Sequence, residues 1–347
     1  MKTWLTFLIL SLALVVVSCN RLPDYGQFPK IDAHVHADTY DFGFIHLAQK
    51  NNFGLMTLVT QSSSQEQIDQ ELAWVGHLHR NFPEVINYST TICMENFASP
   101  QWTSETIERL KRDFEDGAIA VKIWKDIGMT FRRSDDSFIM IDDEEFDPIF
   151  NFIASNKIPV VGHLGEPKNC WLPLDSMTVN SDRNYFSEHP EYHMYLHPDY
   201  PSYEEQIQAR DHMLEKHPDL VFIGAHLGSL EWNVDELAKR LDQYPNMAVD
   251  MAARICHFQV QDRDKVRRFI IDYKDRLLYG TDVGVSENSS PERLEWIQGV
   301  WEHDWRYFTS DDIMTSDKVT GEFQGLKLPL PVLKNIYYEN AKEWLNI

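Results

Sequence analysis

Ile31-Asp32-Ala33-His34-Val35-His36 places two imidazoles two residues apart at the start of the chain's first apolar segment after the N-terminus. On a β-strand, residues two apart point to the same face, so His34 and His36 can reach one point in space. Two neutral imidazoles at one point are a good start for a divalent-metal site. Because such a pair is common by chance, its meaning depends on the rest of the chain.

Apolar segments of strand length alternate with amphipathic segments of helix length. The predicted strands span residues 31–36, 54–60, 85–92, 118–124, 158–163, 220–226, 247–251 and 276–281. The predicted helices that follow them span 42–51, 64–80, 104–115, 144–155, 203–216, 230–243, 262–273 and 291–301. This alternation indicates a parallel sheet covered by helices, and eight units predict an α/β fold of the (β/α)8 TIM-barrel type. A doubly wound open sheet is the alternative, but no glycine-rich phosphate loop follows the first strand.

Two connections are too long for simple loops of this fold. One runs from Leu164 to Ser202, between the fifth strand and the fifth helix, and the other is a C-terminal insertion from Trp301 to Pro329. Long loops in compact domains tend to be lids or binding loops. We therefore expect these insertions to decide the substrate. The last amphipathic stretch, 331–345, is expected to pack against the barrel exterior.

The N-terminus predicts export. Lys2, an apolar run from Leu5 to Val17 and small residues before Cys19 indicate a signal peptide over residues 1–18, and the run is shorter than a membrane span of ~20 residues. The residues before Cys19 resemble a bacterial lipobox, which implies cleavage there and lipidation of Cys19. An ordinary signal peptide or an uncleaved anchor is the alternative. The mature protein is then expected to be a membrane-anchored lipoprotein on the periplasmic or cell-surface side.

Residues 20–28 are predicted to be a tether and residues 29–347 one metal-dependent barrel domain. The net charge is −22 and no dense Lys/Arg tract occurs, which argues against nucleic acid as a partner. The three cysteines after Cys19 are too few and too widely spaced for a disulfide framework. We expect a small-molecule partner and membrane contact only through the lipid, and the chain could form an oligomer.

Further ligand-type residues stand near the ends of other predicted strands: Lys122, His163, His226 and Asp282. His34 and Lys122 are 88 residues apart across three units, and His226 and Asp282 are 56 apart across two. Both intervals are close to the ~31 residues per unit of a typical barrel, so these residues fall at the same end, where barrel enzymes keep their active sites. Singly, His226 or Asp282 could be a backbone partner or a cap. Together, they would be costly polar groups without a shared ligand, so the sequence predicts a metal site.

The same residues resemble a known family. His-x-His on the first strand, His on the fifth and sixth strands and Asp on the eighth resemble the amidohydrolase superfamily. The segments 31–36, Gly224-Ala225-His226-Leu227-Gly228 and Tyr338-Glu339-Asn340-Ala341 resemble its amidohydrolase-related (type 2) branch, from about Pro29 to the end. That branch contains hydrolases and non-oxidative decarboxylases of the aminocarboxymuconate-semialdehyde type.

The resemblance implies roles for individual residues. His34, His36, His163 and Asp282 would hold one divalent metal per chain, with Zn²⁺ expected, and the chemistry of imidazole and carboxylate ligands agrees. Such a metal lowers the pKa of a bound water from 15.7 to about 7. Asp282 is expected to take the proton of this water, and His226 to stabilise or protonate the developing oxyanion or the leaving group.

Lys122 has several possible roles. In some branches of the superfamily a fourth-strand lysine is carbamylated and bridges two metals, and here Lys122 and His226 would then serve a second metal. Lys122 could instead bind a substrate carboxylate or pair with Asp282.

Three other residues are candidate substrate contacts. Arg254, after the seventh strand, could clamp a carboxylate in bidentate fashion, although it could equally form a structural pair with Asp250. Glu166 and Trp232 flank the same rim of the predicted barrel.

The function expected from the sequence is therefore a metal-dependent hydrolase of a C–O or C–N bond. A metal-dependent decarboxylase on the same scaffold is the alternative, in which Arg254 and Lys122 would matter more than the water. A second alternative is a non-catalytic surface binding lipoprotein, against which the five intact site residues argue. Export modestly favours hydrolysis of a scavenged molecule.

Overall fold

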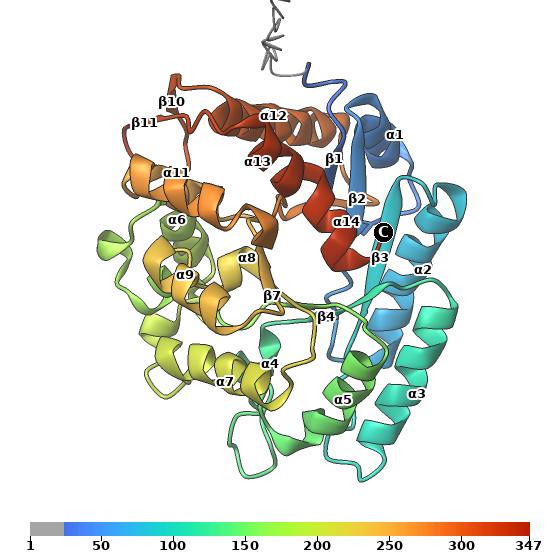
Figure 1. The fold of residues 1–347 in the computed structure, drawn as a ribbon. Helices are drawn as coiled ribbons and strands as arrows, with labels where there is room; N and C mark the ends of the chain where they lie inside the picture. Colours follow the sequence, from blue (N-terminus) through green and yellow to red (C-terminus); the bar gives the residue numbers. More distant parts are fainter. Residues whose placement is uncertain (1–23) are drawn as a thin grey trace, which may run out of the picture.

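The computed structural model describes residues 24–347, which form an α/β fold around one curled parallel sheet (Figure 1). The sheet order is β8-β7-β6-β5-β4-β3-β2-β1-β9, so each strand from β1 to β8 lies beside the next strand in the chain. The strands are β1 (Lys30–Asp38), β2 (Phe53–Thr57), β3 (Ile86–Thr91), β4 (Ala120–Ile123), β5 (Val160–Gly162), β6 (Phe222–Gly224), β7 (Met247–Asp250), β8 (Leu277–Leu278) and β9 (Val283–Ser286). This arrangement is consistent with a TIM barrel.

Each predicted helical segment overlaps an observed helix. These are α1 (Gly43–Lys50), α2 (Gln65–Asn81), α3 (Trp102–Glu115), α5 (Asp147–Ser155), α7 (Tyr203–Lys216), α9 (Val234–Gln243), α11 (Arg263–Asp272) and α12 (Pro291–Thr309). The start of α7 is fixed by a capping box, in which Ser202 and Glu205 satisfy each other's backbone N–H groups. Very short helices, α4 (Asp126–Met129), α8 (Ala225–Gly228) and α10 (Ile255–Gln259), follow β4, β6 and β7.

The predicted end of α12 at residue 301 is wrong. The helix continues to Thr309 because Asp304, Tyr307 and Phe308 extend its buried face. The C-terminal insertion therefore begins after Thr309 and contains the antiparallel hairpin of β10 (Ile313–Thr315) and β11 (Glu322–Gln324).

The other insertion, 164–202, is packed rather than open. It contains α6 (Asn180–Glu188) and short 3-10 turns around the buried cluster Cys170, Met177, Phe186 and Met194. Cys93, Cys170 and Cys256 are buried and free, so no disulfide forms among the cysteines of residues 24–347.

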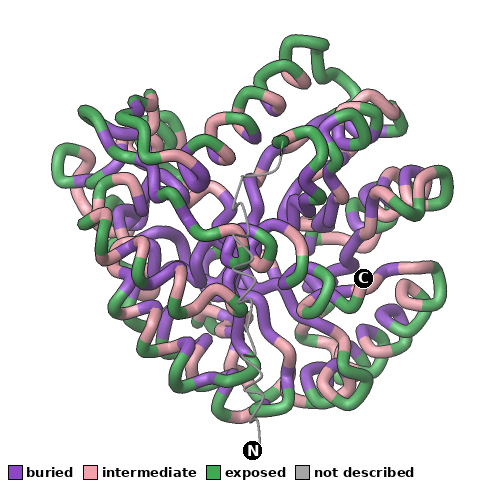
Figure 2. The backbone as a smooth tube through the Cα atoms, turned by 45° about the horizontal axis from the view of Figure 1, so that its top comes forward, coloured by how far each residue is buried: buried purple, intermediate pink, exposed green. Residues whose placement is uncertain are grey.

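Apolar side chains from the strands meet inside the curl of the sheet. This inner apolar layer consists of Ile31, Ala33, Met56, Leu58, Ala120, Val161, Ile223, Ala225, Ala248, Leu278, Ala341 and Leu345. A larger core lies between the sheet and the helices that cover it. Figure 2 shows the same division, with buried backbone inside and exposed backbone along the outer helices.

The C-terminal stretch closes the fold differently from the expectation. It consists of α13 (Leu330–Lys334), a π-helical turn (Asn335–Glu339) and α14 (Asn340–Leu345). Leu333, Ile336 and Tyr337 pack in the outer core, as expected for a helix on the exterior. Ala341 and Leu345, however, join the inner apolar layer, so α14 covers one end of the barrel interior.

The predicted signal peptide and Cys19 lie outside the described residues, and both stay predictions. The described part of the predicted tether is packed, because the rings of Tyr25 and Phe28 lie 5.7 and 5.0 Å from that of Trp305. Within residues 24–347, no helix is both long enough and apolar enough to cross a membrane.

Candidate metal centre

A β-bulge in β1 sets the direction of the two histidines. The register between β1 and β2 shifts between Asp32 and Val35. Before the shift, Ile31 and Ala33 face the inner apolar layer, whereas after it Val35 packs in the outer core. His34 and His36 alternate with Val35 and therefore point into the barrel, with ring centroids 5.4 Å apart.

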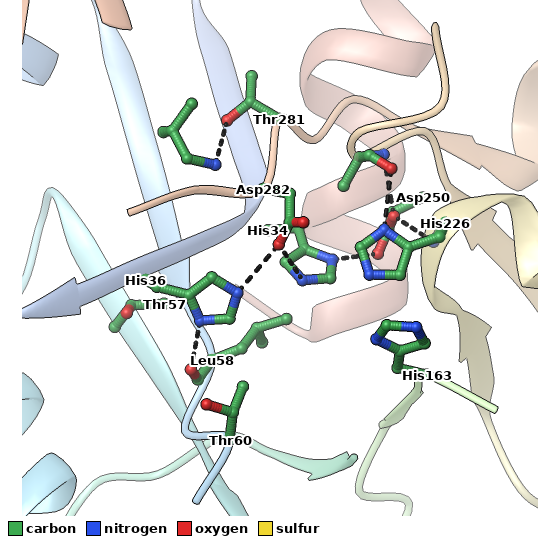
Figure 3. A network of polar contacts seen from close by, with 12 residues as sticks. His34, His36, Thr57, Leu58, Thr60, His163, His226, Asp250, Thr281 and Asp282 are labelled. Carbon is green, nitrogen blue, oxygen red and sulfur yellow. Dashed lines mark hydrogen bonds and ion pairs between the residues drawn. The ribbon is translucent and has the colours of Figure 1, made fainter. Parts of the chain in front are cut away.

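Hydrogen bonds fix the orientation of both imidazoles. Nδ1 of His34 lies 2.8 Å from a carboxylate oxygen of Asp250, and Nδ1 of His36 donates to the carbonyl of Leu58 at 3.0 Å. Both rings therefore direct Nε2 toward Asp282 (Figure 3). Holding one ring nitrogen by a carboxylate or carbonyl is the usual way in which proteins orient metal-ligating histidines.

Asp282 brings the cluster together. One of its carboxylate oxygens, Oδ1, lies 3.3 Å from Nε2 of His34 and 3.0 Å from Nε2 of His36. Burial opposes its ionisation, but the imidazoles of His226, His36 and His34 hold the pKa of Asp282 well below its usual range. The side chain is 33% exposed, whereas that of His34 is fully buried. The centre is therefore open to solvent on the side of Asp282.

Strained backbone carries two of these side chains. Asp282 has a φ of 65°, and His226 begins a left-handed turn that continues through Leu227, Gly228 and Ser229. Non-glycine residues adopt this conformation at a cost, and such strain clusters at functional sites. The turn is held by the backbone N–H of His226, which donates to Asp250 at 2.9 Å.

His226 is also oriented by the backbone. Its Nδ1 donates to the carbonyl of Ala252 at 2.9 Å, and its ring lies 4.7 Å from that of His34. Burial, together with the neighbouring His163, lowers the pKa of His226 well below its ordinary value. Because Nδ1 is used in the bond to Ala252, Nε2 is the nitrogen that can exchange a proton.

His163 and Lys122 lie at the same centre without hydrogen-bond partners. The ring of His163 is 4.3 Å from that of His226, and both of its nitrogens are buried and unpaired. The structure does not place these nitrogens within 4.8 Å of the His34–His36–Asp282 group, so the role of His163 as a ligand stays a prediction. Lys122 is fully buried, its ammonium has no partner, and burial lowers its pKa to about 8. The predicted pairing of Lys122 with Asp282 is therefore wrong.

Glu166 and Arg254 belong to a buried charge cluster beside the centre. Glu166 accepts a hydrogen bond from Lys125, lies 3.6 Å from Nε2 of His163 and is 3.8 Å from a guanidinium nitrogen of Arg254. The alternative pairing of Arg254 with Asp250 is wrong, because both Asp250 oxygens are occupied by other donors.

Trp232 lies farther along the rim. Its indole N–H donates to the hydroxyl of Tyr203 at 2.7 Å, and the ammonium of Lys168 lies 4.0 Å from its ring centroid. The role of Trp232, Glu166 and Arg254 in substrate binding stays a prediction.

The donor set fits a divalent metal. Ligand atoms of His34, His36 and Asp282 lie within 4.8 Å of one another. Nε2 of His34 is buried without a hydrogen-bond partner, which is costly for a polar atom unless something else binds it. A second group, His34, His226 and Asp250, is equally compact, but the nitrogen of His34 nearest Asp250 and the Nδ1 of His226 are already used in hydrogen bonds. The first group is therefore the better candidate.

The sequence does not predict two residues that position the site, Asp250 and Asp32. Asp250 orients His34 and also accepts the N–H groups of His226 and Ala252, and its pKa is lowered to about 2 despite burial because His34 lies beside it. Asp32 accepts the N–H and hydroxyl of Thr281, the residue before Asp282, and burial raises its pKa to about 7. The signal for Asp250 was present, because it ends a strand two residues after an inward-facing alanine.

Comparison with known proteins gives a family and a fold. Residues 31–347 match the family model described as amidohydrolase. No curated protein sequence matches the chain. A solved putative amidohydrolase from Staphylococcus aureus is 12% identical, with a TM-score of 0.56 over 92% of this chain and 100% of that one. The 2,6-dihydroxybenzoate decarboxylase from Rhizobium is 13% identical, with a TM-score of 0.51 over 91% and 99% of the two chains. At these identities the two structures show that the fold is shared.

Proposed function

Because the chain belongs to the amidohydrolase family, we propose that it is a metal-dependent hydrolase that uses water to cleave a C–O or C–N bond of a small molecule. The observation that carries this proposal is the meeting of His34, His36 and Asp282 within 4.8 Å at a point where Asp282 is partly exposed. A base beside metal-type ligands and open to solvent is the arrangement that activation of water requires.

The proposal includes a closed (β/α)8 barrel, in which β8 and β9 are two halves of the eighth strand. Two backbone hydrogen bonds support it: Ala33 N–H donates to Tyr279 at 2.9 Å, and Asp282 N–H donates to His34 at 2.8 Å. The interruption between the halves is where Asp282 turns toward the centre.

His34, His36 and Asp282, with His163 as the fourth ligand, would hold one divalent ion, for which Zn²⁺ is the ion best suited to imidazole and carboxylate. When bound, the ion supplies Lewis acidity that brings the pKa of water near 7. Asp282 would then accept the proton of the attacking water. That proton would pass from Asp282 to Nε2 of His226, which would deliver it to the leaving group while its Nδ1–H bond to Ala252 keeps the ring in place.

A non-oxidative decarboxylase is the second candidate, and Lys122 is the observation that favours it. An unpartnered, buried ammonium at the base of the centre would attract a substrate carboxylate. Alternatively, a carbamate on Lys122 would raise the metal count to two, with His226 as a ligand of the second ion.

A substrate panel distinguishes these reactions. The purified chain would be treated with a chelator, reloaded with Zn²⁺ and tested on lactones, amides, esters and aromatic acids, with acid release and CO₂ release measured separately. A hydrolase releases acid only in the reloaded state, and Asp282→Asn lowers the rate by about 10²–10⁴-fold. CO₂ release without hydrolysis would favour the decarboxylase. Inertness of a folded, metal-loaded chain to the whole panel would favour a binding lipoprotein.

We also propose that the protein is exported and lipidated at Cys19. The residues before Cys19 support this. Incorporation of a labelled fatty acid in a bacterial host, lost in Cys19→Ala, is the expected result, and equal labelling of both chains would contradict it.

A further inference from the structure

A cavity lies beside the segment that carries Asp282. It has a volume of about 300 Å³ and is bounded by α12, the residues after β7 and the β10–β11 hairpin. Gly280 and Thr281, the two residues before Asp282, form part of its wall. Neither Asp282 nor any of the four site histidines lines it, so it is separate from the candidate metal centre.

Gly299 gives this cavity its shape. It stands in the middle of α12, where glycine costs about 0.5–1 kcal/mol relative to alanine. A Cβ at this position would meet no atom within 4 Å, so packing does not require glycine. Trp296 and His303, three residues before and four after, line the same cavity and share its helix face. Gly299 and Trp296 are both exposed, so the glycine leaves a notch between the indole and the imidazole that is open to solvent.

The cavity also contains opposite charges that do not pair. Lys318 on the hairpin and Asp304 on α12 both line it, and the ion pairs formed within residues 24–347 include none between them. Asp317, at the exposed rim, adds a second carboxylate. A ligand that is only an anion would meet excess negative charge, and one that is only a cation would leave Lys318 unpaired.

Two buried polar atoms have no hydrogen-bond partner at this cavity: Oε1 of Gln259 and Nε2 of His303. An unsatisfied buried polar atom costs about 1–3 kcal/mol, which a ligand with complementary groups would recover. Gln259 Oε1 is an acceptor and therefore suits a ligand that donates hydrogen bonds close to Asp304.

We propose that this cavity binds a free α-amino acid with an apolar side chain. The carboxylate of the ligand pairs with Lys318, and its ammonium binds Asp304 and Gln259. Its side chain fills the notch over Gly299, beside Trp296 and Val300. A cavity of about 300 Å³ is at the small end of ligand pockets, which fits one amino acid and not a peptide.

The test is calorimetric titration of the full-length chain, purified in mild detergent, with L-leucine. N-acetyl-L-leucine, which lacks the ammonium, and L-leucinol, which lacks the carboxylate, are the matched probes. L-leucine is expected to bind, and each analogue at least about tenfold more weakly, because each loses one charge-assisted contact. A dissociation constant near 10 mM is about the weakest that a specific site would show. If L-leucine, L-methionine and L-phenylalanine all fail to bind at about 10 mM, the proposal is overturned.

Variants locate the site. Gly299→Leu fills the space beside Trp296 and is expected to weaken leucine binding at least about tenfold. Gly299→Ala is the matched control: it leaves most of this space open and is expected to weaken leucine binding less. Lys318→Met is expected to weaken leucine binding but not leucinol binding. Because Lys318 is on a hairpin surface, this comparison holds even if Gly299→Leu does not fold. Leucine affinity unchanged in both Gly299→Leu and Lys318→Met would overturn the proposal.

The inference is independent of the proposed reaction. Asp282→Asn, which should remove hydrolysis, is expected to bind leucine as the wild type does, because Asp282 does not line the cavity. Loss of leucine binding in this variant would overturn the separation of the two sites.

Discussion

The inner apolar layer and the candidate metal centre are built from the same strands, one inward-facing position apart. Ala120, Val161 and Ala248 belong to the apolar layer. Two residues farther along the chain stand Lys122 in β4, His163 directly after β5, and Asp250 at the end of β7. Because side chains on a strand alternate with a period of two, both sets face the interior. Apolar packing residues and ligand-type residues therefore occupy successive inward-facing positions of the same strands.

The two layers differ in how their polar groups are satisfied. The apolar side chains of the inner layer need no hydrogen-bond partner, whereas the polar layer has unpaired nitrogens on His163 and Lys122. Buried polar atoms without partners lower stability. We infer that the carboxyl ends of the strands bind ligand at the cost of a lower free energy of unfolding. The opposite end, closed by α14, stabilises the fold.

The strongest test of this comparison moves a carboxylate into the apolar layer. Ile223→Asp places an unpaired charge where Ile223 is buried between its strand partners Val161 and Ala248. A cost of several kcal/mol, against a typical domain stability of about 5–15 kcal/mol, is expected to leave the chain largely unfolded at pH 7. Circular dichroism measures the loss.

Ile223→Ala is the matched control for loss of the side chain, and it should remain folded at a cost of about 2–5 kcal/mol. A folded, cooperative Ile223→Asp protein would show that the apolar layer does not exclude charge as proposed.

A smaller effect is expected from Asp250→Asn in the polar layer. The variant keeps the shape of the side chain but weakens the contact that orients His34 and the turn at His226. Loss of such an orienting carboxylate typically costs 10–100-fold in metal affinity. Competition with a fluorescent zinc chelator measures it, and an unchanged affinity in a folded Asp250→Asn protein would mean that His34 does not need this partner.

The smallest expected effect is a gain in the free energy of unfolding, in a variant of Lys122. Burial lowers the pKa of Lys122 to about 8, so the folded state disfavours its charge at neutral pH. Lys122→Met should therefore raise the free energy of unfolding of the metal-free protein at pH 7 by about 1–3 kcal/mol.

The pH dependence follows from the same shift. Between pH 8 and 10.5 the unfolded wild type binds more protons at Lys122 than the folded one, so wild-type stability rises with pH relative to Lys122→Met. The advantage of the variant should thus shrink by pH 10 in urea titrations. A variant that is less stable at pH 7 would show that the ammonium is well paired.

The sequence predicted the strand positions because buried parallel strands are nearly continuous apolar runs. The same spacing correctly grouped His34, His36 and Asp282. It did not predict the bulge in β1 or the left-handed turn at His226, since both depend on long-range contacts with Asp250 and Asp32 rather than on local pattern.

Other departures have local causes. The sequence predicts that α12 ends at Trp301, but Tyr307 and Phe308 continue its buried face to Thr309. β8 and β9 are separate strands, and Asp282 between them adopts a positive φ that a run of strand-forming residues does not reveal. Substrate specificity could not be predicted, since it lies in insertions without a recognisable motif.

The most direct test of the account is the metal content of the folded protein. After loading with Zn²⁺ and exhaustive dialysis, the wild type should retain about one ion per chain, while His34→Ala and Asp282→Asn should retain far less with unchanged circular dichroism. Retention of about two ions by the wild type would support the bridging carbamate on Lys122. A folded wild type that retains no metal would contradict the central claim that these strand ends form a metal centre.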